Sequence, residues 1–142
     1  MIIMKQEQIQ QIIDHAAAAQ PLEACGLLGG ICDETGKTVC KIYLLTNIDQ
    51  STEHFSMDPK EQFAAIKDMR SQGWELLGNF HSHPASPSRP SAEDKRLAFD
   101  SQASYLILSL QDQERPILKS FHIASDQVTE ENITIRGGET NG

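Results

Sequence analysis

The stretch GNFHSHPASPSRPSAED, residues 78–94, constrains the fold of this chain more than any other part of the sequence. Its three prolines fix φ and disfavour helix in the residues before them, so the chain after His83 must follow a stiff, extended path. The apolar run WELLGNFH at 74–81 predicts a β-strand, and the pattern S-A-E-D from Ser91 predicts the start of a helix. A strand, an extended loop and a helix are therefore expected in that order.

Two histidines follow the apolar run, and their spacing allows both to reach one point. Residues i and i+2 of a strand point to the same face, so the imidazoles of His81 and His83 are expected to converge. An H-x-H motif alone is more often made of ordinary surface or loop histidines. The residues downstream favour a more specific interpretation.

Ser91 and Asp94 are three residues apart and share the first turn of the predicted helix. This S-x-x-D pattern has a purely structural explanation as a capping box, which requires no further function. A hydrolytic zinc site, however, requires three nitrogen or oxygen ligands and one open position. His81, His83 and Asp94 supply such a set.

Length, composition and charge limit the function classes. A chain of 142 residues is most simply one domain and needs no metal to fold, so a bound metal is expected to serve chemistry. The 20 acidic and 12 basic residues give a net charge of -8, which argues against nucleic acid as a partner. The start MIIMKQEQIQ lacks the apolar core of a secretion signal, and no run approaches the ~20 apolar residues of a membrane span. We expect a cytoplasmic protein without membrane contact.

The three cysteines do not form a metal-binding pattern. Cys25, Cys32 and Cys40 are odd in number and none pairs with another as C-x-x-C, so reduced thiols are expected rather than a cysteine-based zinc site. Cys25 is expected to be a buried structural residue on the strand face that Glu23 shares.

Apolar spacing and capping signals predict three helices. The first covers 5–19, and the second begins after Asp58 as N-cap and ends before Gly73. The apolar face of the second is expected to carry Phe63, Ile66 and Met69. The third begins at Ser91 and is expected to run to about Asp100.

Short apolar runs predict the strands of one sheet. They lie at 24–31, 39–45, 74–81, 105–110 and 117–124 and within 128–135, with a loop or exposed edge segment at 46–57. The predicted fold class is α/β (α+β), with a mixed, largely antiparallel β-sheet flanked by helices. We expect one domain over 1–136, followed by a flexible tail at 137–142.

The combined motif resembles the signature of the JAMM (MPN+) metallopeptidases, H-x-H-x(7)-S-x-x-D. Family members also carry an upstream glutamate within an E-x-x-G-x-L-x-G-like stretch, and this chain has Glu23 in PLEACGLLGG. The loop NIDQSTEHFSMDP and the order of strands are similar to the bacterial and archaeal branch. The resemblance covers most of the chain and implies an MPN/JAMM-like (cytidine-deaminase-like) fold.

The resemblance also implies a role for each of the matched residues. His81, His83 and Asp94 would bind one Zn²⁺ per chain. Glu23, from an upstream strand, would act as general base and then as general acid towards the departing amine. The Ser91 hydroxyl would help to stabilise the oxyanion.

The implied activity is hydrolysis of an amide bond after the C-terminal Gly-Gly of a ubiquitin-like or sulfur-carrier protein. An extended substrate tail would add as a strand to the loop at 47–57, flanked by Phe55 and Met57. The structural alternative is that this loop only covers the core. Two other classes stay open: a non-catalytic MPN scaffold, and a nucleic-acid-metabolism protein with a similar metal motif. The complete ligand set argues against the first, and the net charge of -8 against the second. The sequence does not identify the leaving group. It also does not decide the oligomeric state, for which a homodimer is one option.

Overall fold

An eight-stranded mixed β-sheet organises residues 1–136, the part of the 142-residue chain that the computed structural model describes. In chain order its strands are β1 (Ile2–Met4), β2 (Cys25–Asp33), β3 (Gly36–Leu45), β4 (Glu75–His83), β5 (Ser104–Ser109), β6 (Ile117–Ala124), β7 (Gln127–Glu131) and β8 (Ile133–Ile135). This part of the chain also contains α1 (Gln6–Ala19), α2 (Pro59–Gln72) and α3 (Ala92–Arg96). The tail predicted at 137–142 lies outside the described residues.

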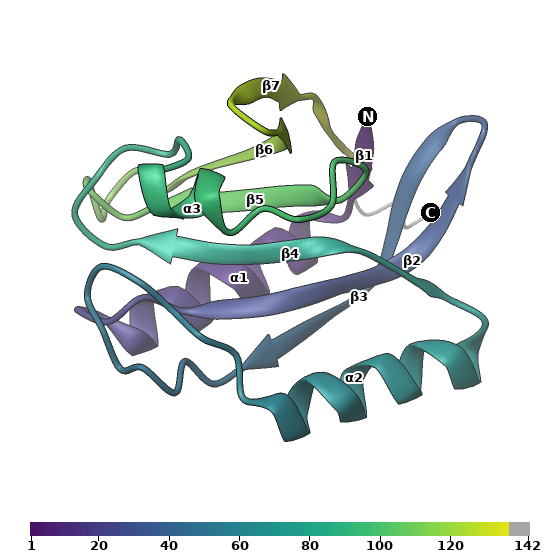
Figure 1. The fold of residues 1–142 in the computed structure, drawn as a ribbon, viewed down its shortest axis with the longest axis horizontal. Helices are drawn as coiled ribbons and strands as arrows, with labels where there is room; N and C mark the ends of the chain where they lie inside the picture. The colour runs from purple at the N-terminus through teal and green to yellow at the C-terminus, as the bar shows by residue number, and fades with distance from the viewer. Residues whose placement is uncertain (137–142) are drawn as a thin grey trace.

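The strand that carries the two histidines lies inside the sheet. The strand order is β7-β6-β5-β4-β2-β3-β1-β8, so β4 has β2 on one side and β5 on the other (Figure 1). β4 pairs antiparallel with β2 and parallel with β5. The β2–β3, β5–β6 and β6–β7 pairs are antiparallel, whereas β1 pairs parallel with β3 and β8. This mixed, largely antiparallel sheet confirms the predicted fold class.

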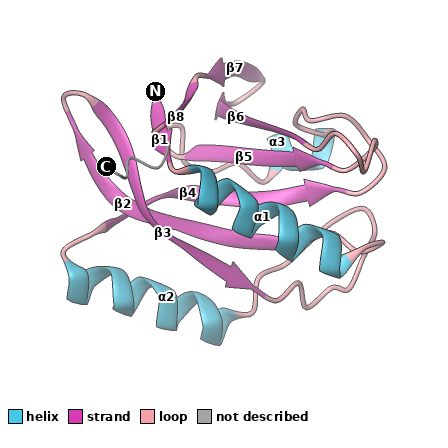
Figure 2. Cartoon of the chain, turned by 180° about the vertical axis from the view of Figure 1, so that it is seen from behind, coloured by secondary structure: helices cyan, strands magenta, loops and turns pink. Residues whose placement is uncertain are grey.

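Different helices cover the two faces of the sheet. Phe80 packs in one core cluster with Ile12 of α1, whereas Leu27 packs in a second cluster with Met69 of α2. Figures 1 and 2, which view the molecule from opposite sides, show α1 on one face of the sheet and α3 on the other. Because successive residues of a strand alternate in direction, the side chain of His81 faces away from α1.

Gly26, the glycine of the E-x-x-G pattern, lies where two neighbours press against the backbone of β2. A Cβ atom at this position would overlap the Phe80 ring and the carbonyl oxygen of Tyr43, so only glycine fits. Gly26 thus lies between β3 and β4, where it pairs with Leu44 and Phe80. The ladder between β2 and β4 ends where Cys25 pairs with His81.

The ends of α2 follow the sequence signals, but its buried face differs from the expectation. The Asp58 side chain accepts a hydrogen bond from the Lys60 N–H, and Gly73 adopts the left-handed conformation with φ of 78°. Ala65 and Met69 are buried, whereas Phe63 is 71% exposed, so its placement on the packed face was wrong. Ile66 is partly buried and also packs against the cluster that contains Ala65 and Met69, so the predicted positions of Ile66 and Met69 on the packed face are confirmed. Among the described residues, no helix is long and apolar enough to span a membrane.

The strands at the two ends of the described chain also differ from the prediction. β1 was not expected, because three apolar residues give no period of their own; it is held by parallel pairing with β3 and β8. The segment 128–135, predicted as one strand, forms two: β7 pairs with β6, and β8 pairs with β1.

The third helix is shorter than expected, since α3 ends at Arg96 rather than near Asp100. None of its residues is buried, so packing does not extend it. The Tyr105 hydroxyl accepts from the Asp100 N–H and donates to the Asp100 carbonyl oxygen, which holds Asp100 in a turn.

Candidate metal centre

Three side chains from two elements meet on the α3 side of the sheet. The distances from His81 Nε2 to His83 Nε2, from His81 Nε2 to Asp94 Oδ2 and from His83 Nε2 to Asp94 Oδ2 are all 3.1 Å. Strand β4 supplies both imidazoles from one face, and the first turn of α3 supplies the carboxylate. The structure therefore brings together the three residues that the sequence suggested as metal ligands.

The triangle fits a tetrahedral cation. Zinc binds imidazole nitrogen and carboxylate oxygen at about 2.0–2.2 Å, which puts neighbouring ligand atoms of a tetrahedron about 3.3 Å apart. The observed 3.1 Å edges match one face of such a tetrahedron, and two nitrogens with one oxygen are ligands that zinc accepts.

The extended proline loop orients one of the imidazoles. His83 Nδ1 lies 2.9 Å from the carbonyl oxygen of Pro87, an acceptor, so this nitrogen carries the proton and donates. The lone pair of Nε2 is then available to a cation, as is usual for metal-binding histidines. His81 is covered by the ring of Phe55, which stacks at 4.7 Å between centroids with an interplanar angle of 24°.

The first turn of α3 fixes the position of the carboxylate. The Ser91 N–H donates to Asp94 Oδ2 at 2.9 Å, and the Asp94 N–H donates to Ser91 Oγ at 3.0 Å. This is the capping box that the sequence offered as the structural explanation, and it coexists with the approach of both imidazoles to the same Oδ2. Because Ser91 Oγ accepts here, its own proton is free to donate elsewhere.

The ionised forms of Asp94 and His83 stabilise each other. Burial alone would raise the pKa of Asp94, but hydrogen bonds from His81 and His83 hold that pKa far below its ordinary value. Burial opposes protonation of His83, but its hydrogen bonds to Asp94 and to the Pro87 carbonyl raise its pKa. The carboxylate therefore stays ionised, which is the form that ligates metals.

Glu23 is close enough to His83 and Asp94 for their charges to shift its pKa, but it does not belong to the triangle. Its side chain is buried, with 5% exposure, and its Oε1 has no hydrogen-bond partner among the described residues. The pKa of Glu23 is raised to about 8. Burial is the largest cause; the charge of Asp94 also raises this pKa, whereas the charge of His83 lowers it. A divalent cation nearby would stabilise the ionised form of this carboxylate. The expected strand location was wrong: Glu23 lies in the segment before β2, which begins at Cys25.

Cys25 is fully buried in the cluster beneath α2. Burial raises the pKa of its thiol to about 12, so at neutral pH the nucleophilic thiolate is absent. The structural interpretation of this cysteine is confirmed.

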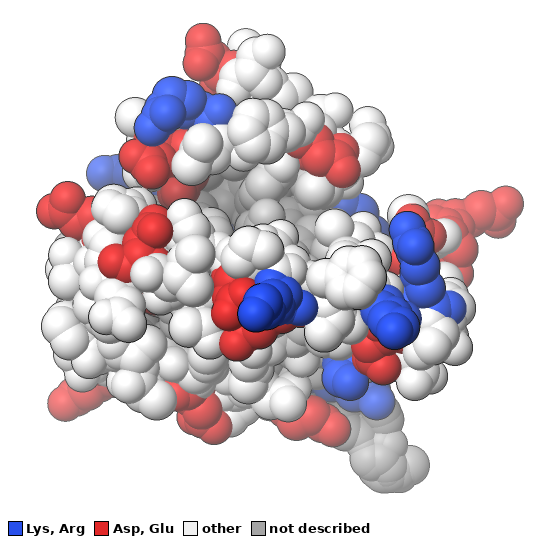
Figure 3. Space-filling model, turned by 60° about the horizontal axis from the view of Figure 1, so that its bottom comes forward, with Lys and Arg blue, Asp and Glu red and all other residues white. Residues whose placement is uncertain are grey.

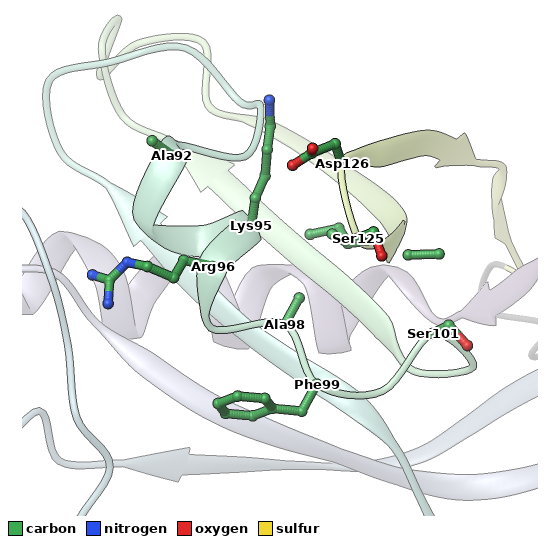
Figure 4. Close-up of a pocket in the computed structure, with 10 residues that line it drawn as sticks. Ala92, Lys95, Arg96, Ala98, Phe99, Ser101, Ser125 and Asp126 are labelled. Carbon is green, nitrogen blue, oxygen red and sulfur yellow. The ribbon is translucent and has the colours of Figure 1, made fainter.

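A small pocket adjoins the metal centre, and a larger groove lies beside it. The pocket, of about 60 Å³, is lined by Phe55, Asn79, His81, Asp94, Leu97, Tyr105, Ile107 and Ile123. The groove, of about 920 Å³, runs between α3 with its following loop and the β6–β7 turn (Figure 4). It shares Ile123 with the pocket, but none of the five predicted site residues lines it.

The neighbours of the metal centre other than its ligands were not found from the sequence. Leu97, Tyr105 and Ile123 come from three separate segments and form no motif with the histidines. Phe55 was expected to flank a substrate rather than to stack on a ligand. The only sequence signal for a role of Phe55 was its position as an apolar residue in a polar loop.

Comparisons with known proteins agree with this fold and this constellation. Residues 5–123 match the family described as prokaryotic homologs of the JAB domain. The chain is 28% identical over 135 residues to the CysO-cysteine peptidase of Mycobacterium tuberculosis, covering 95% of this chain and 91% of that protein. It is 34% identical over 97 residues to the desampylase of Haloferax volcanii, covering 68% of each.

Solved structures show the same architecture. The solution structure of protein DSY2949 from Desulfitobacterium hafniense has a TM-score of 0.89 and 56% identity, covering 96% of this chain and 94% of that one. The crystal structure of AF2198, a JAB1/MPN domain protein from Archaeoglobus fulgidus, has a TM-score of 0.62 at 22% identity over 95% of this chain and 98% of that chain. This last likeness shows the fold alone.

Proposed function

This chain belongs to the prokaryotic JAB-domain family, and from that membership and its metal-ligand triangle we propose that it is a zinc-dependent peptidase or isopeptidase. The bond it hydrolyses follows the C-terminal Gly-Gly of a ubiquitin-like or sulfur-carrier protein. The single observation that carries the proposal is the convergence of His81, His83 and Asp94, with edges of 3.1 Å, beside the buried carboxyl of Glu23.

Each residue has one task in the proposed reaction. His81, His83 and Asp94 hold the zinc ion, which when bound supplies Lewis-acid chemistry and makes water acidic enough to deprotonate near pH 7. Glu23 takes the proton from the attacking water and delivers it to the departing amine. The Ser91 hydroxyl, whose proton is not used by the capping box, donates to the oxygen that becomes negative as water attacks the carbonyl.

The relatives support the class of substrate. One is described as a CysO-cysteine peptidase and another as a desampylase. We propose that the tail of a Gly-Gly carrier lies along the loop 46–57, which is closed by an antiparallel bridge between Asn47 and Met57. Glycines suit such a site, because only they are slim enough to pass close to the metal.

The two alternatives have less support. A scaffold without activity does not require a complete ligand triangle or a buried acid beside it. A nucleic-acid partner conflicts with the net charge of -8. On the face drawn in Figure 3, Lys and Arg side chains lie in separate groups beside acidic ones rather than in a continuous stripe.

Intact-mass measurement tests the proposal. The zinc-loaded protein is incubated with Gly-Gly-ended carriers extended by a single cysteine, by a short peptide or through a lysine side chain. We expect at least one adduct to shorten to its Gly-Gly end, and chelation of zinc to stop the reaction. Full zinc content with every adduct intact would exclude this activity and favour the scaffold.

A further inference from the structure

We propose that the side chains of Asn47 and Ser82 are positioning residues that hold the main chain of Glu23 beside the metal centre. The inference rests on the proposed function, since it takes Glu23 as the proton-transferring group. Ser82 is the variable position of the H-x-H motif, and Asn47 lies outside the motif. The hydrogen bonds of both side chains go to other residues than the three metal ligands.

Glu23 has no strand partner to fix its backbone. It lies between α1 and β2, and the loop 46–57 supplies the hydrogen bonds that a strand would otherwise give. The Glu23 N–H donates to the carbonyl oxygen of Ser51 at 2.8 Å, and the Glu23 carbonyl oxygen accepts from Asn47 Nδ2 at 3.0 Å. Both polar groups of its main chain are therefore held by one loop.

The next residue is tied to the strand that carries the histidines. The Ala24 N–H donates to Ser82 Oγ at 2.8 Å, and the Ser82 N–H donates to the Ala24 carbonyl oxygen at 3.0 Å. Ser82 stands between the two imidazole ligands in sequence and is 1% exposed. Its hydroxyl thus links the segment of the proposed base to the strand of the ligands, just beyond the end of the β2–β4 ladder.

Asn47 uses the full hydrogen-bonding capacity of its side chain. Besides Glu23, Nδ2 donates to the carbonyl oxygen of His54 at 3.1 Å, and Oδ1 accepts from the N–H groups of Asp49 at 3.0 Å and Ser56 at 3.1 Å. An amide is the side chain that offers two donors and a two-fold acceptor in this arrangement. An aspartate in its place would keep the bonds from Asp49 and Ser56 but lose both bonds that Nδ2 donates, to Glu23 and to His54.

The position of the Glu23 carboxyl depends on these backbone bonds. Its Oε1 has no hydrogen-bond partner among the described residues, so the main chain is what sets its location. A misplacement of about 1 Å in a catalytic group can cost on the order of 100-fold in rate.

The experiment compares Ser82→Ala and Asn47→Asp with the wild-type protein. We measure kcat and KM on the carrier adduct, zinc content and, by NMR, hydrogen exchange of the Ala24 amide and the chemical shift of the Glu23 carbonyl carbon. Ser82→Thr keeps the hydroxyl and serves as the conservative rescue. Ser120→Ala is the matched control, because Ser120 is also buried but donates to Glu131 at 2.7 Å, in another cluster.

We expect both variants to keep zinc and KM and to lose kcat by roughly 100-fold. Ser82→Ala should show faster exchange at the Ala24 amide, which donates to the lost hydroxyl. Asn47→Asp should shift the resonance of the Glu23 carbonyl carbon, because that carbonyl oxygen accepts the lost bond. Ser82→Thr should restore kcat, and Ser120→Ala should leave it unchanged. Unchanged kcat despite faster Ala24 exchange or a shifted Glu23 carbonyl resonance, or loss of zinc in Ser82→Ala, overturns the proposal while the proposed function stands.

Two further outcomes are also decisive. Should Ser82→Ala fail to fold, Asn47→Asp decides alone, because it keeps the loop bonds from the Asp49 and Ser56 N–H groups. Should the wild type cleave no adduct, the proposed function fails. Unchanged exchange at Ala24 in Ser82→Ala and an unchanged Glu23 carbonyl resonance in Asn47→Asp would then overturn the anchoring as well.

Discussion

At the scale of single residues, the same oxygen atom of Asp94 takes part in the capping box and in the candidate metal site. Asp94 Oδ2 accepts from the Ser91 N–H and approaches both imidazoles. The hydrogen bond from the Ser91 N–H would orient this oxygen towards the histidines with or without a bound cation. Glu23 is separate from this set, which suits a group that must exchange a proton rather than ligate.

Replacing the two carboxyl groups separates these roles. We expect Glu23→Gln to keep zinc and lower kcat by about 10³-fold, within the range for removal of a general base. Asp94→Ala should lose the zinc itself, because two imidazoles remain of three ligands. Metal analysis and steady-state kinetics check both, with the exposed Glu7→Gln as control. Equal zinc content and full activity in both variants would reverse the assignment.

At the scale of elements, α3 is a five-residue helix stabilised by its cap rather than by burial. Its N-cap, Ser91, is exposed, and the capping box supplies hydrogen bonds that packing does not. An element so short can place one carboxylate accurately because both halves of the box act on Asp94. Its end at Arg96 leaves Leu97 free to line the pocket beside the metal centre.

Ser91→Ala tests whether the cap residue also acts in catalysis. The Ser91 N–H to Asp94 bond survives this change, so zinc binding should persist, with a stability loss of about 1 kcal/mol from the missing side-chain cap. Loss of an oxyanion donor should lower kcat by about 10²–10³-fold. Kinetics and thermal unfolding separate the two effects. An unchanged rate with lowered stability would show that the hydroxyl only caps the helix.

At the scale of the whole molecule, a buried acid far from the metal centre joins several strands. Glu131 of β7 accepts from the hydroxyls of Ser104 on β5 and Ser120 on β6, each at 2.7 Å, and lies 3.1 Å from His122 Nε2. Burial alone would raise the pKa of Glu131, but the hydrogen bonds from the two serines and the charges of His122 and Lys37 lower it below its ordinary value. The ionised form is therefore the one that stabilises the fold.

This network predicts a pH-dependent stability. A depressed carboxyl pKa contributes stability above the unfolded value of about 4.5, and this is lost as pH falls through the folded value. Glu131→Gln should lower the free energy of unfolding by roughly 1–3 kcal/mol at pH 7, and the difference from wild type should shrink at pH 3. Chemical denaturation at both pH values measures it, with the exposed neighbour Glu130→Gln as control. A difference that does not depend on pH would exclude a role for the charge.

The sequence by itself determined the features that depend on neighbours along the chain. The i, i+2 spacing placed His81 and His83 on one face, the S-x-x-D pattern formed its capping box, and Asp58 and Gly73 marked the ends of α2. These follow from backbone periodicity and local hydrogen bonds, which need no distant contact.

Only the tertiary structure decided what depends on distant pairing. It exposed Phe63, ended α3 early and paired β1 with β8. It also joined the Glu23 carbonyl oxygen to the Asn47 side chain and the Ala24 N–H to the Ser82 hydroxyl. Ala24 and Ser82 are 58 residues apart, so no local pattern encodes their contact. Such contacts form only when the whole sheet fixes which strands are neighbours, because the free energy of burial and pairing is shared by the entire chain.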